Sequence, residues 1–486
     1  MNPALLLFFV LGYFGLLLGV AWLSSRGADN DSFFIGNKNS HWMLVAFGMI
    51  GTSLSGVTFI SVPGAVGSTA FGYLQIALGQ FIGYFVIAYL LLPLYYRLNL
   101  SSIYRYLGER LGARAHQTGA IFFMLSRTLG ATARLYLVVR ILQDLVLERL
   151  GMPFWLTAIA ILALIVLYTF EGGVKTIVWT DTLQTSGMLI GLLVCIGFLL
   201  RGLDLSFTQS LQQLDAAGLS TVFNPDPMSR YFFAKQILAG MFISIAMTGM
   251  DQEMMQKNIS VKRLEDSQKN MLTLSLIMLV VVLMFLFLGG LLHLFAQAHG
   301  MSERGDKLFG AVVLGHLPAW VQLVFVIALI SALFPSADGA ITALTSSFCI
   351  DLLGMQVRQD WTEAKKTRLR KTIHLVFAAV FLALVLGFRW VDNPSMIGLI
   401  LKLAGYTYGP LLGLFAFGLF TRLQPRDGWV PAVALTAPLL CWLLDSQQRR
   451  LFGSYEIGLE LLLLNGLLTF AGLWLISPRR AAAVQG

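Results

Sequence analysis

The sequence predicts an all-α, polytopic membrane protein, and two features of the chain carry that prediction. Only 12% of the 486 residues are charged, about half of the roughly 25% found in an average soluble protein. Apolar stretches near the ~20 residues that a helix needs to cross hydrocarbon recur along the whole chain. These stretches are continuously apolar and do not alternate, so they predict spanning helices and exclude the strands of a barrel.

The predicted spans form one leading helix, two successive groups of five and a final pair. The groups cover residues 43–200 and 230–420 and the final pair covers 428–476, so residues 1–486 make a single membrane domain. The thirteen predicted spans are 3–24, 43–64, 73–96, 118–147, 154–170, 178–200, 230–252, 271–295, 318–350, 373–391, 396–420, 428–445 and 457–476.

Basic residues are concentrated in alternate connections between these spans. The connections that hold Arg97 to Arg114 and Arg358 to Lys371 belong to the rich set, and the opposite set holds few. Basic connections mark the cytoplasmic side. We therefore predict a plasma-membrane protein with its amino terminus outside and its carboxyl terminus in the cytoplasm. The net charge of +9 reflects this topology, and no nucleic acid partner is expected.

Three spans carry glycine, proline or hydroxyl residues at their centres, where an anchoring helix has no need of them. They read GMIGTSLSGVTFISVPG over 48–64, ISIAMTGMDQEMMQ over 243–256 and LFPSADGAITALTSS over 333–347. Broken helices free carbonyl groups that hold an ion or line a cavity. Close helix packing is the alternative for any one span. Interruptions at matching positions of the two five-span groups favour a transporter site.

Two carboxylates lie inside these apolar spans, where an ionised group needs a partner or an ion. Asp181 stands near the start of the sixth span and Asp338 in the middle of the ninth. Carboxylate, hydroxyl and carbonyl oxygens suit a hard cation, so both residues are predicted to bind a coupling ion. The alternative for both carboxylates is structural pairing, which for Asp338 would be a buried ion pair with Arg127, Arg134 or Arg140 of the fourth span.

Polar side chains of the second, third and seventh spans are the predicted contacts of a solute. An amide or hydroxyl in a helix bundle also serves simply to bridge neighbouring helices. The predicted solute-binding residues are Thr58, Gln75, Gln80, Asp251 and Gln252.

Five segments of the chain resemble the sodium-solute symporter family, whose members carry glucose, proline, iodide, sialic acid and vitamins. The segment over 168–184 is the most specific of them. The segments are DSFFIGNKNSHW (31–42), SLSGVTFISVPG (53–64), YTFEGGVKTIVWTDTLQ (168–184), TGMDQEMMQKNIS (248–260) and TALTSSFCIDLL (342–353).

The resemblance implies a leucine-transporter-type fold, in which two inverted five-helix repeats form the core, and it implies Na+ as the coupling ion. A main sodium site would use groups of the broken first core helix and of the eighth core helix. These positions are Gly51, Leu54, Ala332 and Ser336. An additional sodium site of some members carries over to Asp181, Ser336 and Asp338, beside Gly339.

Three positions depart from the family pattern. Pro335 stands where the family has a hydroxyl residue, and Asp338 replaces a neutral hydroxyl with a carboxylate. The second change would either strengthen sodium binding there or let a proton serve in place of sodium, and it leaves the stoichiometry and the identity of the ion open. Ala77 replaces a polar family residue near Thr58 and Gln80, so the solute stays unidentified.

The resemblance implies a secondary active transporter that moves a small organic solute with sodium by alternating access, and not an enzyme. A proton-coupled symporter on the same fold and a transporter-like membrane sensor are the alternatives. An intramembrane enzyme is not favoured, because the chain has no HExxH motif and its six histidines are scattered. The expected partners are the solute, the sodium ion and the lipid bilayer, with the oligomeric state left open.

Overall fold

The computed structural model describes residues 3–26, 30–38, 40–148, 151–170, 173–390 and 396–478. Over these residues the chain is helical and has no β-strand, only an isolated bridge between Asn224 and Phe232. The predicted all-helical class is therefore confirmed. Arg149 and the basic residues after 478, which enter the predicted orientation, lie outside the described residues.

The helices up to the middle of the chain contain the first five-span group. They are α1 (Pro3–Ser24), α2 (Asn30–Ile35), α3 (Trp42–Thr69), α4 (Tyr73–Val86), α5 (Leu92–Arg97), α6 (Arg105–Arg110), α7 (Ala113–Leu142), α8 (Phe154–Thr169), α9 (Gly173–Gly202) and α10 (Phe207–Ala216). A π-helical turn, η2 (Ile87–Leu91), joins α4 to α5.

The remaining helices contain the second group and the final pair. They are α11 (Phe233–Ser244), α12 (Gln252–Ile259), α13 (Leu264–Ala298), α14 (Leu308–His316), α15 (Ala319–Leu333), α16 (Asp338–Ser347), α17 (Glu363–Phe388), α18 (Met396–Thr407), α19 (Gly409–Phe420), α20 (Val430–Ser446), α21 (Gln448–Phe452) and α22 (Leu461–Leu475). Short turns between them are η5 (Ile245–Gly249), η6 (Gly305–Lys307), η7 (Phe334–Ser336), η8 (Phe348–Leu352) and η9 (Asp427–Trp429).

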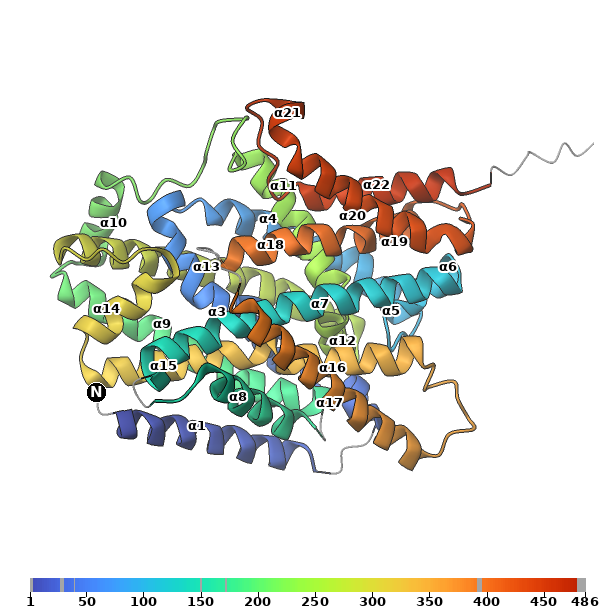
Figure 1. Cartoon of the computed structure of the whole chain (residues 1–486), viewed down its shortest axis with the longest axis horizontal. Helices are drawn as coiled ribbons and strands as arrows, with labels where there is room; N and C mark the ends of the chain where they lie inside the picture. The colour runs from blue at the N-terminus through green and yellow to red at the C-terminus, as the bar shows by residue number, and fades with distance from the viewer. Residues whose placement is uncertain are drawn as a thin grey trace, which may run out of the picture.

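Eight helices of the described chain are long and apolar enough to cross a membrane, and two bent helix pairs raise the number to ten. Three shorter apolar helices, in α1, α8 and α22, occupy the other predicted spans. Every predicted span thus falls on a helix, while the count of thirteen crossings stays a prediction. Most of the long helices run alongside one another, with α1 at one edge of the bundle and α20 and α22 near the other (Figure 1).

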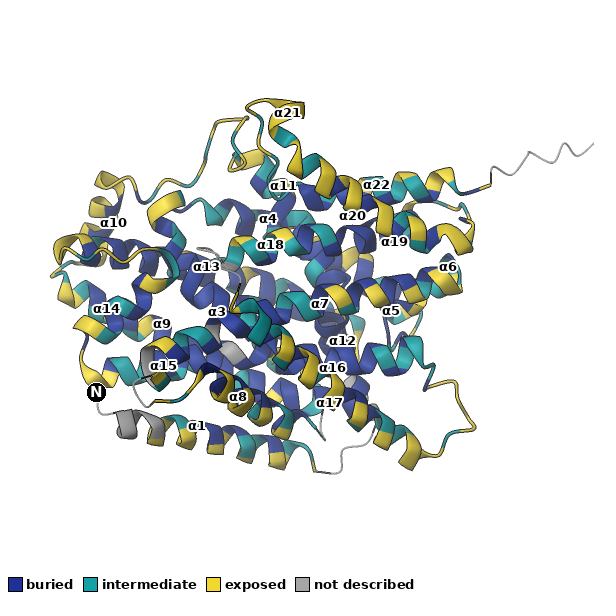
Figure 2. Ribbon diagram, viewed as in Figure 1, coloured by how far each residue is buried: buried dark blue, intermediate teal, exposed yellow. Residues whose placement is uncertain are grey.

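Burial divides the helices into an inner and an outer set. Of the most apolar stretch of α3, 78% is buried, whereas in α17 and α20 the share is 22%. Figure 2 shows the same division, with buried residues along α3 and α12 and exposed ones along α1 and α17. An apolar helix that stays exposed faces lipid in a membrane protein, so the polar breaks of α3 lie at the centre of the molecule.

The first two helices of each five-span group pack crosswise on those of the other group. Helix α3 packs on α13, and α11 packs on α4. Such an exchange is what two inverted repeats would produce. The division into repeats at 43–200 and 230–420 remains a prediction.

All three predicted interruptions correspond to irregular backbone. In α3 the irregular residue is Ser55, with φ 45° and ψ 165°. The chain bends by 64° between η5 and α12, and η7 is a 3-10 turn around Pro335 between α15 and α16. A fourth bend, of 44° between α18 and α19, was not predicted.

Two boundaries differ from the prediction in ways that matter for the site. Helix α9 begins at Gly173 rather than at 178, so Asp181 lies about 12 Å inside the helix at 1.5 Å per residue. The seventh span does not end at 252 but continues as α12 to Ile259. A polar run that reads as a connection is therefore a buried helix, because its side chains pair with one another inside the protein.

Candidate functional site

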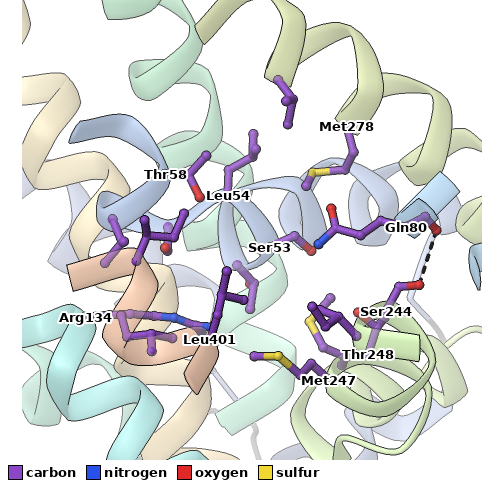
Figure 3. A pocket seen from close by; sticks show the side chains of 18 of the residues that line it. Ser53, Leu54, Thr58, Gln80, Arg134, Ser244, Met247, Thr248, Met278 and Leu401 are labelled. Atoms are coloured by element: carbon purple, nitrogen blue, oxygen red, sulfur yellow. Dashed lines mark hydrogen bonds between the residues drawn. The ribbon is translucent and has the colours of Figure 1, made fainter. Parts of the chain in front are cut away.

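A cavity of about 90 Å³ lies against the break in α3 (Figure 3). The irregular Ser55 interrupts the helical hydrogen bonds and frees backbone groups of the turn before it. The cavity is lined by Thr52, Ser53, Leu54, Ser55, Val57 and Thr58 of α3, Tyr73, Gln80 and Tyr84 of α4, Arg127 and Arg134 of α7, Ile243, Ser244, Met247, Thr248 and Met254 of the α11 to α12 region, Met278 and Val282 of α13, and Ile397, Ile400 and Leu401 of α18.

The two arginines of the cavity differ in their partners. Arg127 is 4% exposed and forms an ion pair with Glu253, and its second guanidinium nitrogen lies 3.8 Å from Asp251 Oδ2. Arg134 forms no hydrogen bond or ion pair with any of the described residues, although it lines the same cavity. Figure 3 places Arg134 and Gln80 on opposite sides of the cavity.

The remaining wall offers hydroxyl groups on one part and methionines on another. Ser53, Thr58 and Thr248 supply hydroxyls, and the Ser53 Oγ is buried without a hydrogen-bond partner. Ser244 is already engaged, because its hydroxyl donates to the carbonyl groups of Met241 and Gln80. The predicted solute contacts Thr58 and Gln80 therefore both line the cavity.

The other three predicted solute contacts do not line it. Gln75 borders a separate cavity of about 520 Å³ beside the 217–225 segment, where its amide donates to the Gly72 carbonyl. Asp251 caps α12 and accepts a 2.6 Å hydrogen bond from Tyr408. Gln252 bonds the backbone of Ser101 and Ile103. Polar residues beside a helix break satisfy freed backbone groups, and these side chains do that here.

Two of the four predicted main sodium positions, Gly51 and Ser336, lie where α3, α9 and η7 meet. A Cβ atom built on Gly51 would stand 2.5 Å from Thr185 Oγ1 and 3.4 Å from Pro335 Cγ. The hydroxyls of Ser336 and Thr185 are buried without a hydrogen-bond partner. Leu54 precedes the break at Ser55, and Ala332 stands one turn before Ser336. Oxygen atoms that lack a donor suit a hard cation, so the residues present fit sodium.

Asp181 is fully buried and forms an ion pair with a lysine of the chain. Its Oδ2 accepts from Lys257 Nζ at 2.7 Å and from Thr52 Oγ1 at 3.2 Å, while its Oδ1 has no partner. Gly48 leaves room for this carboxylate, because a Cβ there would stand 3.2 Å from the Asp181 Cβ. Helix α12 brings Lys257 into the core, although its place in the sequence suggested a cytoplasmic connection.

Asp338 stands apart from the arginines. Its Oδ2 accepts a 2.6 Å hydrogen bond from Tyr168, and its Oδ1 accepts from the Gly339 amide at 2.5 Å. The alternative of an ion pair with a fourth-span arginine is not found, because Arg127 pairs with Glu253 and Arg140 with Asp144. Gly339 itself packs against the Glu253 carboxylate.

Three residues of the site went unrecognised in the sequence. Lys257 follows Glu253 by four residues, which on a helix places acid and base side by side. Thr185 follows Asp181 by four and so shares its face of α9. Arg134 follows Arg127 by seven, two turns along α7. Each spacing was visible, but only the packing of the helices shows which faces meet.

The model of the family described as "Sodium:solute symporter family" matches residues 33–430. The sodium/iodide cotransporter of Homo sapiens is 25% identical over 439 residues, covering 88% of this chain and 67% of that protein. The sodium/sialic acid symporter NanT of Aliivibrio fischeri is 23% identical over 486 residues, covering 94% of this chain and 91% of that protein.

Two solved structures share the fold over nearly the whole chain. A Na+-coupled sialic acid symporter in a substrate-bound outward-open state has a TM-score of 0.82 at 17% identity, covering 98% of this chain and 97% of that chain. Mhp1, a nucleobase-cation-symport-1 family transporter in a closed conformation, has a TM-score of 0.62 at 15% identity, covering 92% and 94%. These likenesses confirm the predicted leucine-transporter-type fold.

Proposed function

Because this chain belongs to the sodium:solute symporter family, we propose that it carries a small organic anion across the membrane together with sodium. The chain is a multi-pass membrane transporter coupled to sodium, and it is not an enzyme. The observation that supports an anionic solute is Arg134, a guanidinium on the cavity wall with no acidic partner among the described residues.

A guanidinium inside the membrane is costly without a partner. A carboxylate neutralises the charge of the guanidinium and matches its planar donor geometry, because it can accept two parallel hydrogen bonds. Arg127 is not free for this role, because Glu253 already occupies it. The solute's carboxylate therefore lies at Arg134.

The rest of the cavity fits a solute whose remaining part is compact and partly apolar. Met247, Met278 and Leu401 offer an apolar surface, and Thr58 and Gln80 offer hydrogen bonds opposite Arg134. Several relatives are named for anions, namely iodide, sialic acid and monocarboxylates. Together these features favour a small monocarboxylate.

Sodium binds beside the same α3 break in this proposal, where Gly51 faces α9 and η7. The carbonyl groups of Gly51, Leu54 and Ala332 and the hydroxyl of Ser336 are its ligands, joined by Thr185. The unpartnered hydroxyls of Ser336 and Thr185 support this set. Leu54 also lines the cavity, so sodium and the solute would both contact the same irregular turn. Sodium that orders this turn would thereby prepare the solute cavity.

A comparison of matched solutes tests the anion proposal. Purified protein in proteoliposomes should take up a small monocarboxylate when sodium is present outside, and it should not take up the corresponding primary amide. The amide keeps the size and hydrogen-bonding groups but loses the charge that Arg134 pairs with. Equal uptake of the acid and the amide would rule out recognition by Arg134.

The orientation belongs to the same proposal, with the amino terminus outside. Two of the basic residues that support it, Lys257 and Arg370, are buried, but the loop at Arg358 is exposed and basic. The three native cysteines are buried, so an Arg358→Cys variant offers one accessible thiol. A membrane-impermeant maleimide should label it in opened vesicles and not from outside intact cells. Labelling from outside would reverse the topology.

A further inference from the structure

The ammonium group of Lys257 lies where a second coupling ion would be expected. It stands 2.7 Å from Asp181 Oδ2, 2.7 Å from Thr52 Oγ1 and 3.6 Å from Glu253 Oε1. Lys257 is 2% exposed, and both of its acidic partners are equally buried. A carboxylate and a hydroxyl are oxygen ligands of the kind that bind sodium, yet here an amine of the chain itself fills the position.

Lys257 is also part of a series of buried charges, which we call the ion-pair chain. It consists of Asp181, Lys257, Glu253 and Arg127, in which acid and base alternate from one contact to the next. The four formal charges sum to zero, and a further acid, Asp251, lies 3.8 Å from Arg127 at the end of the chain. A buried carboxylate needs a counter-charge, and Asp181 already has one that cannot diffuse away.

The position of Lys257 in the fold lets it keep its contact with Asp181 or exchange it for a contact with Glu253. It lies on α12, the short helix bent by 64° from the preceding helix, whereas Asp181 lies on α9. Glu253, one turn earlier on α12, is a second acceptor that travels with Lys257. If α12 moves relative to α9, the ammonium keeps an acid within reach.

We propose that Lys257 is a tethered cation that replaces a sodium ion at Asp181, so that one sodium ion accompanies each solute. This rests on the proposed main sodium site at Gly51, Leu54, Ala332 and Ser336. Lys257 neutralises Asp181 whether or not solute is bound, and the carrier therefore returns without a second ion. The residue positions Asp181 and does not touch the solute.

The wild-type protein supplies the first test. The ratio of sodium to solute entering proteoliposomes, measured with the two isotopes in parallel, should be one. Sodium-induced thermal stabilisation, which needs no solute, should follow a single-site curve with a Hill coefficient near 1. A flux ratio of two would overturn the proposal without any variant.

Removing the tethered charge supplies the second test. In Lys257→Gln the uncompensated Asp181 should accept a second sodium ion, so near saturation the stabilisation should rise twice as steeply with the logarithm of sodium concentration. In Lys257→Gln/Asp181→Asn both charges are absent, so the steepness should return to that of the wild type. Lys262→Gln, an exposed lysine just beyond α12, is the matched control and should behave as wild type.

A folded Lys257→Gln protein with an unchanged sodium curve would contradict the proposal. If that variant does not fold, a double variant that folds and still binds two sodium ions contradicts it equally. Failure of the main sodium site would look different, because Ser336→Ala would then keep its full sodium affinity in an otherwise wild-type protein.

Discussion

The two arginines of α7 stand two turns apart on one face of the helix, and their surroundings are opposite. Arg127 lies in the ion-pair chain, where every cation touches an acid. Arg134 lines the solute cavity with no acid in contact. A buried ion pair replaces the water that its charges lost, and an unpaired guanidinium leaves that cost unmet until an anion binds. The paired Arg127 is therefore expected to stabilise the fold, and the unpaired Arg134 is expected to bind the solute.

Loss of Glu253 should be the most damaging test of this contrast. The Glu253→Gln substitution removes the acid shared by Arg127 and Lys257 and should cost about 3–5 kcal/mol of stability, the usual effect of breaking a buried pair. Thermal unfolding in detergent measures it. Glu265→Gln, at an exposed acid of α13, should change nothing. A Glu253→Gln protein as stable as wild type would remove the structural role assigned to the ion-pair chain.

Loss of Arg134 should have the opposite signature. Arg134→Gln should weaken solute affinity by about 1.5–3 kcal/mol, roughly 10- to 150-fold, and leave the unfolding temperature unchanged or raised. Solute competition against labelled uptake measures the first quantity. Arg140→Gln, at the partly exposed partner of Asp144, is the control. A fall in stability without loss of affinity would make Arg134 a structural residue.

The sodium ligands should show a smaller effect that is confined to the ion. Ser336→Ala and Thr185→Ala should each weaken sodium affinity by about 1.5 kcal/mol, roughly tenfold. Solute affinity at saturating sodium should stay the same, since neither hydroxyl lines the cavity. Titration of solute uptake with sodium measures both, with the exposed Thr436→Ala as control. Equal losses of sodium affinity and solute affinity would mean that the two ligands do not have separate sites.

The smallest expected effect concerns the break itself. Ser55→Gly should stabilise the protein by about 1 kcal/mol, because a non-glycine residue at φ 45° and ψ 165° is strained. Ser53→Gly, two residues earlier in helical conformation, should instead destabilise by about 0.5–1 kcal/mol. Chemical or thermal unfolding distinguishes the two signs. Destabilisation by both substitutions would mean that Ser55 carries no strain.

The sequence predicted the helical class, the helix on which each predicted span falls and all three breaks, because apolar length and helix-breaking residues are local properties. Of its predicted solute contacts, Thr58 and Gln80 line the cavity. It assigned Asp181 to a coupling ion and did not show that Lys257 pairs with this carboxylate. In the sequence this lysine ends a polar run, DQEMMQK, that resembles a loop. Its burial is tolerated because Asp181 on α9 and Glu253 on α12 pair with its charge.

The same limit explains Asp251, Gln252 and Gln75. Asp251 and Gln252 lie beside a break and Gln75 lies in the first turn of α4, and sequence alone does not distinguish a side chain that binds a solute from one that bonds a neighbouring group of the protein. Tyr408, Ser101 and Gly72 occupy these side chains. Those partners lie on other segments or in a turn, so the contacts depend on tertiary packing.

The break at Ser55 also lies between two sets of contacts of α3. Before it, the Leu44 carbonyl accepts from Thr182, and Thr52 donates to Asp181, both on α9. After it, Phe59 packs on Phe285 of α13, and Met49 in the first half also accepts a hydrogen bond from Asn270 of α13. A displacement of α9 relative to α13 would therefore act on the torsion angles around Ser55. We expect this residue to serve as a hinge beside both the proposed sodium ligand Leu54 and the wall of the solute cavity.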